Sequence, residues 1–341
     1  MPNPDPTAAI APGLIDQQYA RKRVLITGGL GFIGSTLAHR LVAVDAEVVI
    51  LDALLADSGA NPHNIESIRD RVTLRIGDVR DGEALADLVP NAQVIFNLAG
   101  ALSHTGSMAN PLEDLDINCR AQVGLLELCR HRNPDVRIVY AGTRGQYGRP
   151  QYLPVDERHP LTSADTNGIN KTAGEAYHLL YHEHFGLKAS SLRMSNTYGP
   201  RHQMRHHRQG VIGWFVRQAM EGGTIKVFGD GRQVRDATYV DDVVDALLLA
   251  GARDAAAGQA FNLGSAPIAL GELAEAIVKA AGRGRVELVP YPEASRRVEV
   301  GDYVADISKI QRLLGWSPAT SLDDGLARTV AFYEQHKSNY W

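Results

Sequence analysis

The chain has 341 residues, of which 44% are apolar and 22% charged, a balance typical of a globular protein that folds in water. Its length suggests one large domain or two coupled ones. The formal net charge of −4 provides no basic excess, so nothing in the composition favours nucleic acid or an anionic membrane as a partner. Any phosphate group of a ligand must therefore be held by local features.

The two cysteines and the chain start bear on the compartment. Cys119 and Cys129 fall in one predicted helix, about 15 Å apart, which is too far for a disulfide. Free cysteines indicate a reducing compartment. Residues 1–20 lack the basic start and apolar core of a signal peptide, and no apolar run approaches the ~18 residues of a membrane helix. We therefore expect a cytoplasmic protein whose residues 1–20 form an N-terminal extension.

The first two thirds of the chain alternate between short apolar runs and helical patterns. The apolar runs predict buried strands at 23–27, 47–51, 72–76, 94–98, 137–140 and 187–193. Strands that alternate with helices indicate a parallel, doubly wound sheet.

After Tyr198 the pattern changes. Residues 201–208 form a polar loop rich in histidine and arginine. We interpret it as a phosphate-facing or lid loop, because its histidines lack the cysteines or paired carboxylates of a metal site. Helices are predicted over 270–281 and 322–336, and the stretch 234–261 is expected to return to the sheet.

A glycine-rich turn follows the first predicted strand and opens a helix, in the segment TGGLGFIG at residues 27–34. In that setting Gly28 permits a tight turn, Gly31 lets the backbone approach a pyrophosphate, and Gly34 allows the helix to pack closely on the strand. The free amides at the helix start then face the phosphates. The sequence thus predicts a dinucleotide site.

The second predicted strand leads to Asp52, where a carboxylate can bind the ribose hydroxyls of adenosine. No arginine follows directly, and a carboxylate repels a 2′-phosphate. NAD is therefore favoured over NADP. We predict an α/β fold with a Rossmann-type doubly wound parallel sheet (residues 21–197 and 234–263) and a smaller C-terminal substrate-binding lobe (198–233 and 264–341).

From residue 22 to 335 the chain resembles the extended short-chain dehydrogenase/reductase family that acts on nucleotide sugars. The resemblance rests on segments spread along the chain: TGGLGFIG (27–34), GDVRD (77–81), NLAG (97–100), Ser107 with Pro111 and Asn118, the segment 192–201, the segment 229–242, NLG (262–264) and LGWSP (314–318). The resemblance implies nucleoside-diphosphate sugars as substrates and a homodimer built through the helices that contain 118–130 and 171–184. The cofactor residues that it implies, together with the glycine turn and the acid, are Gly28, Gly31, Phe32, Ile33, Gly34, Asp52, Asp78, Val79, Leu98, Ala99 and Lys171.

The catalytic residues of this family are a Ser or Thr, a Tyr and a Lys, the last two spaced YxxxK. By the resemblance, Thr143 and Lys171 occupy the first and last positions, but Asn167 stands where the tyrosine is expected. An asparagine amide forms hydrogen bonds but is no general base near neutrality.

Three interpretations of this departure remain open. Another group accepts the proton, the candidates being His104, Lys171 itself, or a water held by Thr143 and Asn167. His104 has a suitable ordinary pKa, but it is equally compatible with a structural role. Alternatively, the reaction does not need the usual base, or the protein binds NAD and its ligand with little turnover.

The segment 143–148, TRGQYG, bears on the reaction and the substrate. The family's sugar 4,6-dehydratases resemble TDEVYG here, with the Asp–Glu pair as acid and base for water elimination. This chain has Arg144 and Gly145 instead. Arg144 can bind a carboxylate, as on a uronic acid, or be an ordinary surface arginine. Arg235 and Asn196 match residues that the family uses on the diphosphate of the nucleotide sugar.

The resulting expectation is an NAD-dependent nucleotide-sugar epimerase that works through a transient keto-sugar. The enzymatic alternatives are a dehydratase, decarboxylase or reductase of the same family. The alternative from another class is a catalytically idle protein that binds NAD and a nucleotide sugar.

Overall fold

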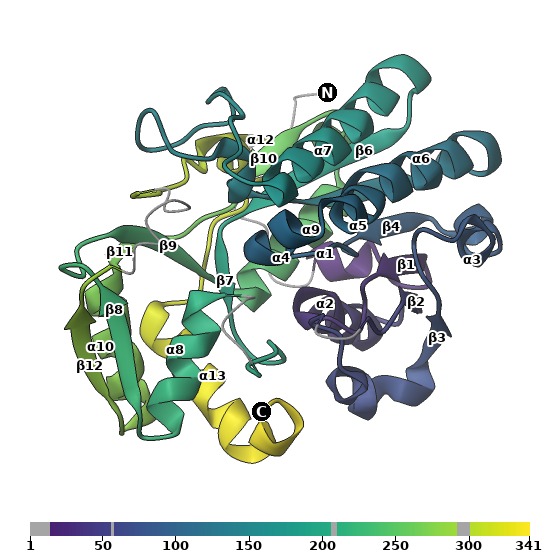
Figure 1. Cartoon of the computed structure of the whole chain (residues 1–341). Helices are drawn as coiled ribbons and strands as arrows, with labels where there is room; N and C mark the ends of the chain where they lie inside the picture. Colours follow the sequence, from purple (N-terminus) through teal and green to yellow (C-terminus); the bar gives the residue numbers. More distant parts are fainter. Residues whose placement is uncertain (1–13, 56–57, 206–209, 292–300) are drawn as a thin grey trace.

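The computed structural model describes residues 14–55, 58–205, 210–291 and 301–341. A parallel sheet of seven strands crosses it in the order β10-β6-β5-β4-β1-β2-β3 (Figure 1). The strands are β1 (Arg23–Thr27), β2 (Glu47–Asp52), β3 (Val72–Ile76), β4 (Val94–Asn97), β5 (Arg137–Thr143), β6 (Lys188–Met194) and β10 (Ala260–Asn262). The chain order reverses between β1 and β4, which is where doubly wound sheets bind their ligands.

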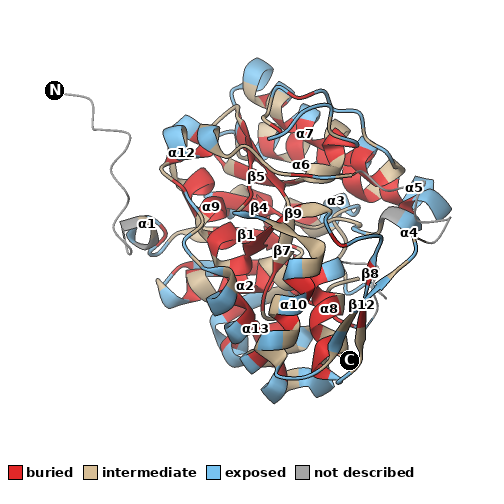
Figure 2. Cartoon of the chain, turned by 90° about the vertical axis from the view of Figure 1, so that its left-hand side faces the viewer, coloured by how far each residue is buried: buried red, intermediate tan, exposed pale blue. Residues whose placement is uncertain are grey.

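Helices cover both faces of this sheet (Figures 1 and 2). One face carries α3 (Gly82–Ala86), α6 (Ala121–Arg132) and α7 (Thr166–Phe185), and the other carries α2 (Phe32–Ala43) and α9 (Val240–Ala252). Because both faces are covered, β4 is buried along its whole length and β1 along four of its five residues. This explains why these strands are continuous apolar runs in the sequence.

Shorter helical segments connect these layers. They are η1 (Pro62–Arg71), η2 (Val89–Asn91), α4 (His104–Ala109), α5 (Pro111–Leu115), the π-helical turn η3 (Asp116–Arg120), η4 (Arg144–Tyr147), η6 (Asp254–Ala256) and η7 (Lys337–Asn339). Cys119 in η3 and Cys129 in α6 are both free. None of the described helices is long and apolar enough to cross a membrane.

The last residues of the predicted N-terminal extension belong to the fold. A short helix, α1 (Leu14–Gln17), precedes Tyr19, which is buried beside Phe96 of the central sheet. The Tyr19 hydroxyl donates a 2.6 Å hydrogen bond to the carbonyl of Leu248. Residues 1–13 lie outside the described residues.

The second lobe has its own core. It contains a three-stranded sheet of β7 (Asn196–Tyr198), β9 (Val234–Tyr239) and β11 (Pro267–Ala269), and a pair formed by β8 (Thr224–Phe228) and β12 (Arg285–Val289). The helices α8 (Val211–Met220), α10 (Leu270–Ala281) and α13 (Leu322–His336) surround these strands.

Two segments lie differently from the expectation. Residues 234–261 return to the main sheet only at their end, since β9 pairs with β7 and β11 while β10 pairs with β6. Conversely, α12 (Ser308–Leu314) and Trp316 fall in the range predicted for the C-terminal lobe, but they join the core of the seven-stranded sheet. The Trp316 indole donates to the carbonyl of Asp242 in α9, 2.8 Å away. The two lobes are thus interleaved along the chain.

Helix α7 packs closely on the centre of the sheet. A Cβ atom at Gly174 would lie 2.5 Å from the Tyr140 hydroxyl of β5 and 2.7 Å from the carbonyl oxygen of Asn118. The next residue of α7, Glu175, forms a buried ion pair with Arg193 of β6. The position of α7 over β5 and β6 is therefore closely fixed.

We predict that Gly174→Ala lowers the free energy of unfolding by about 1–3 kcal/mol, because the added methyl group overpacks the contact between α7 and β5. Gly82→Ala is the matched control. Nothing lies within 4 Å of a Cβ there, so this variant should be neutral or gain up to ~1 kcal/mol. Urea titration measures both, and equal stability of the two variants would contradict the packing argument.

Candidate functional site

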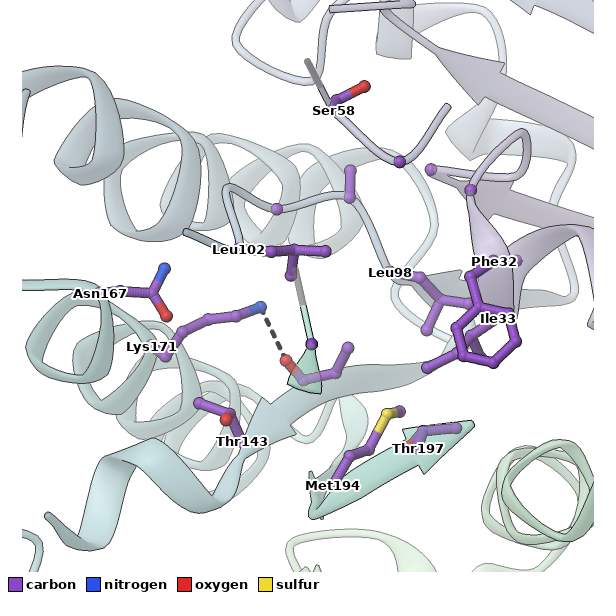
Figure 3. A pocket seen from close by; sticks show the side chains of 18 of the residues that line it. Phe32, Ile33, Ser58, Leu98, Leu102, Thr143, Asn167, Lys171, Met194 and Thr197 are labelled. Carbon is purple, nitrogen blue, oxygen red and sulfur yellow. Dashed lines mark hydrogen bonds between the residues drawn. The ribbon is translucent and has the colours of Figure 1, made fainter. Parts of the chain in front are cut away.

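A cavity of about 570 Å³ opens at the carboxyl ends of the central strands (Figure 3). Its wall contains nearly all the residues that the sequence singled out: Gly28, Gly31, Phe32, Ile33, Gly34, Asp52, Asp78, Val79, Leu98, Ala99, Thr143, Arg144, Asn167, Lys171, Asn196 and Arg235. His104 is the remaining candidate. It begins α4 rather than lying in a loop, and its side chain lies outside the described part of the structure.

The glycine turn at the start of α2 leaves no space for a side chain at Gly28 or Gly34. Gly28 has a φ of +71°, and a Cβ there would lie 2.9 Å from the amide nitrogen of Ala99. A Cβ at Gly34 would lie 2.3 Å from the carbonyl oxygen of Gly28. Gly31 is the N-cap of α2 and provides no side-chain cap. The first amides of the helix, which have no partner within it, are thus available to an anion.

Asp52 lies at the end of β2 and is buried in the same wall. Its carboxylate accepts 3.0 Å hydrogen bonds from the amide of Leu30 in the glycine turn and from the amide of Leu54. Burial raises the pKa of Asp52, and the two amides oppose that shift. Each oxygen retains a lone pair, so the carboxylate can also accept from ligand hydroxyls.

Two further segments border this end of the cavity. Asp78 is held by Arg80 at 2.6 Å, which keeps the pKa of the Asp78 carboxyl low. Thr27 accepts hydrogen bonds of 3.1 Å from the amides of Leu98 and Ala99, which fixes the chain after β4 against the end of β1.

Lys171 lies on α7 at the opposite end of the cavity (Figure 3). Its ammonium donates a 2.8 Å hydrogen bond to the carbonyl of Ala141 in β5 and lies 4.7 Å from the centre of the Tyr140 ring. The side chain is 3% exposed. Burial lowers the pKa of Lys171 to about 8, and the Asp114 carboxylate opposes the shift.

Asn167 is fixed by hydrogen bonds one turn before Lys171. Its side-chain nitrogen donates to the carbonyl of Ala101 at 2.6 Å and to Asp114 at 3.0 Å. Asn170 donates to the other oxygen of Asp114 at 2.8 Å. These contacts orient the Asn167 side chain. Its amide nitrogen only donates hydrogen bonds and does not accept a proton.

Sequence reasoning missed Asp114, a buried carboxylate in α5. The available signal was Asn167 and Asn170, which share a helix face at a spacing of i, i+3 and so require a common polar partner if buried. The sequence alone does not identify that partner, because it lies more than fifty residues away.

Thr143 ends β5 beside Lys171 (Figure 3), and its hydroxyl oxygen accepts the amide of Gly145 at 3.2 Å. The hydroxyl hydrogen of such a threonine can be donated to a ligand oxygen. Tyr147, four residues later in the chain, is buried and does not line the cavity. Its hydroxyl accepts from Arg193 at 2.6 Å and donates to Asn262 at 2.7 Å.

The second lobe supplies the remaining wall. Asn196 in β7 donates a long 3.4 Å hydrogen bond to the carbonyl of Asp236, and Arg235 in β9 donates to the carbonyl of Gly301 at 2.6 Å. Arg144, the first residue of η4, is partly buried. The lid-like loop predicted over 201–208 is described only to Arg205. His202 stacks on Phe32, with ring centres 4.7 Å apart.

The chemistry of this wall fits NAD. A cradle that a Cβ would fill, a helix start without a side-chain cap and a buried carboxylate follow one another along one side. They match the pyrophosphate and the adenosine ribose of a dinucleotide. No group of three metal-binding side chains exists among residues 14–55, 58–205, 210–291 and 301–341.

We predict that Lys171→Met stabilises the protein by about 1–3 kcal/mol at neutral pH. The native state holds the Lys171 proton less tightly than the unfolded state, so the cost of burying the charge is fully present below pH 8. The cost disappears as the pH rises toward the unfolded pKa of 10.5. Urea titrations at pH 7 and 9.5 measure it, and the advantage of the variant should shrink at the higher pH. A variant less stable at both values would contradict the assignment.

Comparison with known proteins agrees with this geometry. Residues 24–264 match the model of the NAD dependent epimerase/dehydratase family. UDP-glucose 4-epimerase of Mycolicibacterium smegmatis is 35% identical over 319 residues, covering 91% of this chain and 98% of that protein.

Solved structures extend the likeness. UDP-glucose 4-epimerase of Thermotoga maritima with UDP-glucose superposes with a TM-score of 0.83 at 28% identity, covering 92% of this chain and 99% of that one. The dTDP-glucose 4,6-dehydratase DesIV of Streptomyces venezuelae, with NAD bound, gives the same TM-score and identity over 93% of this chain and 98% of that one. Together with the cradle described above, these likenesses support the NAD prediction.

Proposed function

The chain belongs to the NAD-dependent epimerase/dehydratase family, and we propose that it is a nucleotide-sugar epimerase that works through a transient keto-sugar. The observation that carries the proposal is that Lys171 and Thr143 border one cavity with the glycine turn and Asp52. When bound, NAD supplies a hydride acceptor. The relatives named above act on nucleotide sugars and support that class of substrate.

The coenzyme roles are assigned along the cavity wall. The turn at Gly28, Gly31 and Gly34, with the amides of Phe32 and Ile33, binds the pyrophosphate. Asp52 binds the adenosine ribose, while Asp78 and Val79 border the adenine. Leu98, Ala99 and Lys171 border the nicotinamide. Asn196 and Arg235 bind the diphosphate of the nucleotide sugar from the second lobe.

Oxidation of a sugar carbon requires a proton acceptor for its hydroxyl. In our proposal Lys171, as the neutral amine, accepts that proton, and Thr143 orients the same hydroxyl. Asn167 does not titrate. Its contacts to Ala101 and Asp114 hold the turn of α7 that carries Lys171. His104 is the rival acceptor, since it follows β4 at the same end of the sheet.

The second half of the reaction reverses the first. The cavity would have to let the keto-sugar turn so that its other face meets the coenzyme, which would supply the hydride, and Lys171 would return its proton to the oxygen. Water elimination is less well supported, because residues 144 and 145 are an arginine and a glycine and offer no acid–base pair there. Unchanged product mass with inverted configuration identifies an epimerase. A loss of 18 Da identifies a dehydratase, and no turnover leaves a binding protein.

We predict that kcat rises with pH through an inflection near 8, the pKa of Lys171. Lys171→Met should lower kcat about 10²–10⁴-fold, the usual contribution of a general base. Lys171→Arg is the matched control, because it keeps the charge but does not deprotonate, and it should be equally inactive. Asp114→Asn should move the inflection to lower pH, since that carboxylate opposes the downward shift.

Two results would contradict this assignment. Activity that survives in Lys171→Arg would exclude the amine as the proton acceptor. A profile that keeps its shape in the Lys171 variants and changes in His104→Ala would assign the proton to His104. Both experiments use purified protein loaded with NAD. The conversion of UDP-glucose is measured by a coupled assay and by product mass.

We further propose the homodimer through the helices that contain 118–130 and 171–184, and we extend its interface to α5, which leads into the first of them and packs against α7. Large apolar side chains are exposed on α5 and α7: Leu112 is 72% exposed, Ile169 58% and Leu180 42%. Exposed apolar surface of this kind indicates a protein partner, and a second copy of the chain would bury it. We place the enzyme in the cytoplasm, as its two free cysteines suggest.

The double variant Leu112→Asp/Leu180→Asp should be a monomer by light scattering at concentrations where the wild type is a dimer. Leu288→Asp is the control, because Leu288 is also exposed, at 56%, but lies on β12 in the other lobe. A wild-type protein that is monomeric at micromolar concentration would refute the dimer.

A further inference from the structure

Arg144 lies on the sugar side of the cavity, one residue beyond Thr143. It begins η4 at the carboxyl end of β5, and it shares the wall with Asn196 and Arg235 of the second lobe. The cavity thus places a third cation near Lys171 and Arg235. The sequence alone left open whether this arginine is an ordinary surface residue, and the structure places it, partly buried, in the cavity wall.

The Arg144 guanidinium lies near two buried residues, Tyr303 and Asp236. Its guanidinium carbon lies 5.4 Å from the centre of the Tyr303 ring, which is fully buried. The nearby Asp236 carboxylate is fully buried, and one of its oxygens accepts the amide of Ala305 at 3.1 Å. Burial raises the pKa of Asp236 to about 6, with the amide of Ala305 and the charge of Arg144 opposing. Asp236 does not border the cavity, so Arg144 is the residue of this pair that lines the wall.

The charges of the described wall divide between its two ends. Asp52 and Asp78 lie at the ends of β2 and β3, where the adenosine is assigned. At the sugar end the cations are Lys171, Arg144 and Arg235. The acid there is Asp165, which caps α7 by accepting the amide of Gly168 at 2.8 Å. Three cations and one acid of the described residues therefore line this end, with the buried Asp236 carboxylate beside Arg144.

We propose that Arg144 selects nucleotide sugars that carry a carboxylate on the sugar, the nucleoside-diphosphate uronic acids. This inference rests on the proposed function and names its substrate class. A guanidinium binds a carboxylate with two parallel hydrogen bonds, and it does so better in a partly buried site than in water. Arg235 is assigned to the diphosphate, so Arg144 provides the charge that matches the additional carboxylate.

Calorimetry with NAD-loaded protein tests the proposal without requiring turnover. The probes are UDP-glucose and UDP-glucuronate, which differ only at C6, and the corresponding dTDP and GDP pairs. We expect the wild type to bind the carboxylate sugar at least tenfold more tightly than its neutral counterpart. Arg144→Gln should abolish this preference and leave the affinity for the neutral sugar within about twofold.

Two variants complete the design. Arg144→Lys keeps the charge but not the paired geometry, so it should keep part of the preference. Arg158→Gln is the control, because the Arg158 side chain is 91% exposed and pairs with Asp156, and it should change nothing. Thermal unfolding of each variant identifies any that do not fold.

Two outcomes would overturn the inference. Equal or tighter binding of the neutral sugar by the wild type would exclude selection for a carboxylate. An Arg144→Gln variant that loses affinity equally for both sugars would mean that the arginine serves only to balance Asp236. Failure of every pair to bind would instead refute the proposed function itself.

Discussion

The hydrogen bond between the Lys171 ammonium and the Ala141 carbonyl is the interaction on which the rest of the site depends. It connects α7 to the carboxyl end of β5 at 2.8 Å, and Lys171 is almost wholly buried. The close approach at Gly174 brings the helix to this distance. Burial makes the charge costly, and the same burial brings the pKa into the range where an amine can accept a proton.

Asn167 is one of two asparagines that bind a buried carboxylate near Lys171. Its amide and that of Asn170 both donate to Asp114, so each oxygen of this buried carboxylate accepts a hydrogen bond. That negative charge limits how far the pKa of Lys171 falls. Burial thus favours the neutral amine of Lys171, the charge of Asp114 favours its ammonium, and the pKa of Lys171 lies at about 8.

The arrangement of the glycine turn and Asp52 is easier to predict from sequence than the arrangement of the residues around Lys171. Gly28, Gly34 and Asp52 act through the backbone near them, and their spacing within one strand–turn–helix unit is visible in the sequence. The role of Asp114 is not, because a contact across more than fifty residues depends on how α5 and α7 pack. The predicted return of 234–261 to the sheet was correct only for β10, since period-two patterns do not identify the sheet that a strand joins.

The most direct measurement is a crystal structure of the protein with NAD and a nucleotide sugar. We expect the pyrophosphate at the start of α2, the adenosine ribose on Asp52, and the Lys171 amine within hydrogen-bond distance of the reacting sugar hydroxyl. A coenzyme bound elsewhere, or a hydroxyl that contacts His104 while Lys171 remains on Ala141 alone, would contradict this expectation.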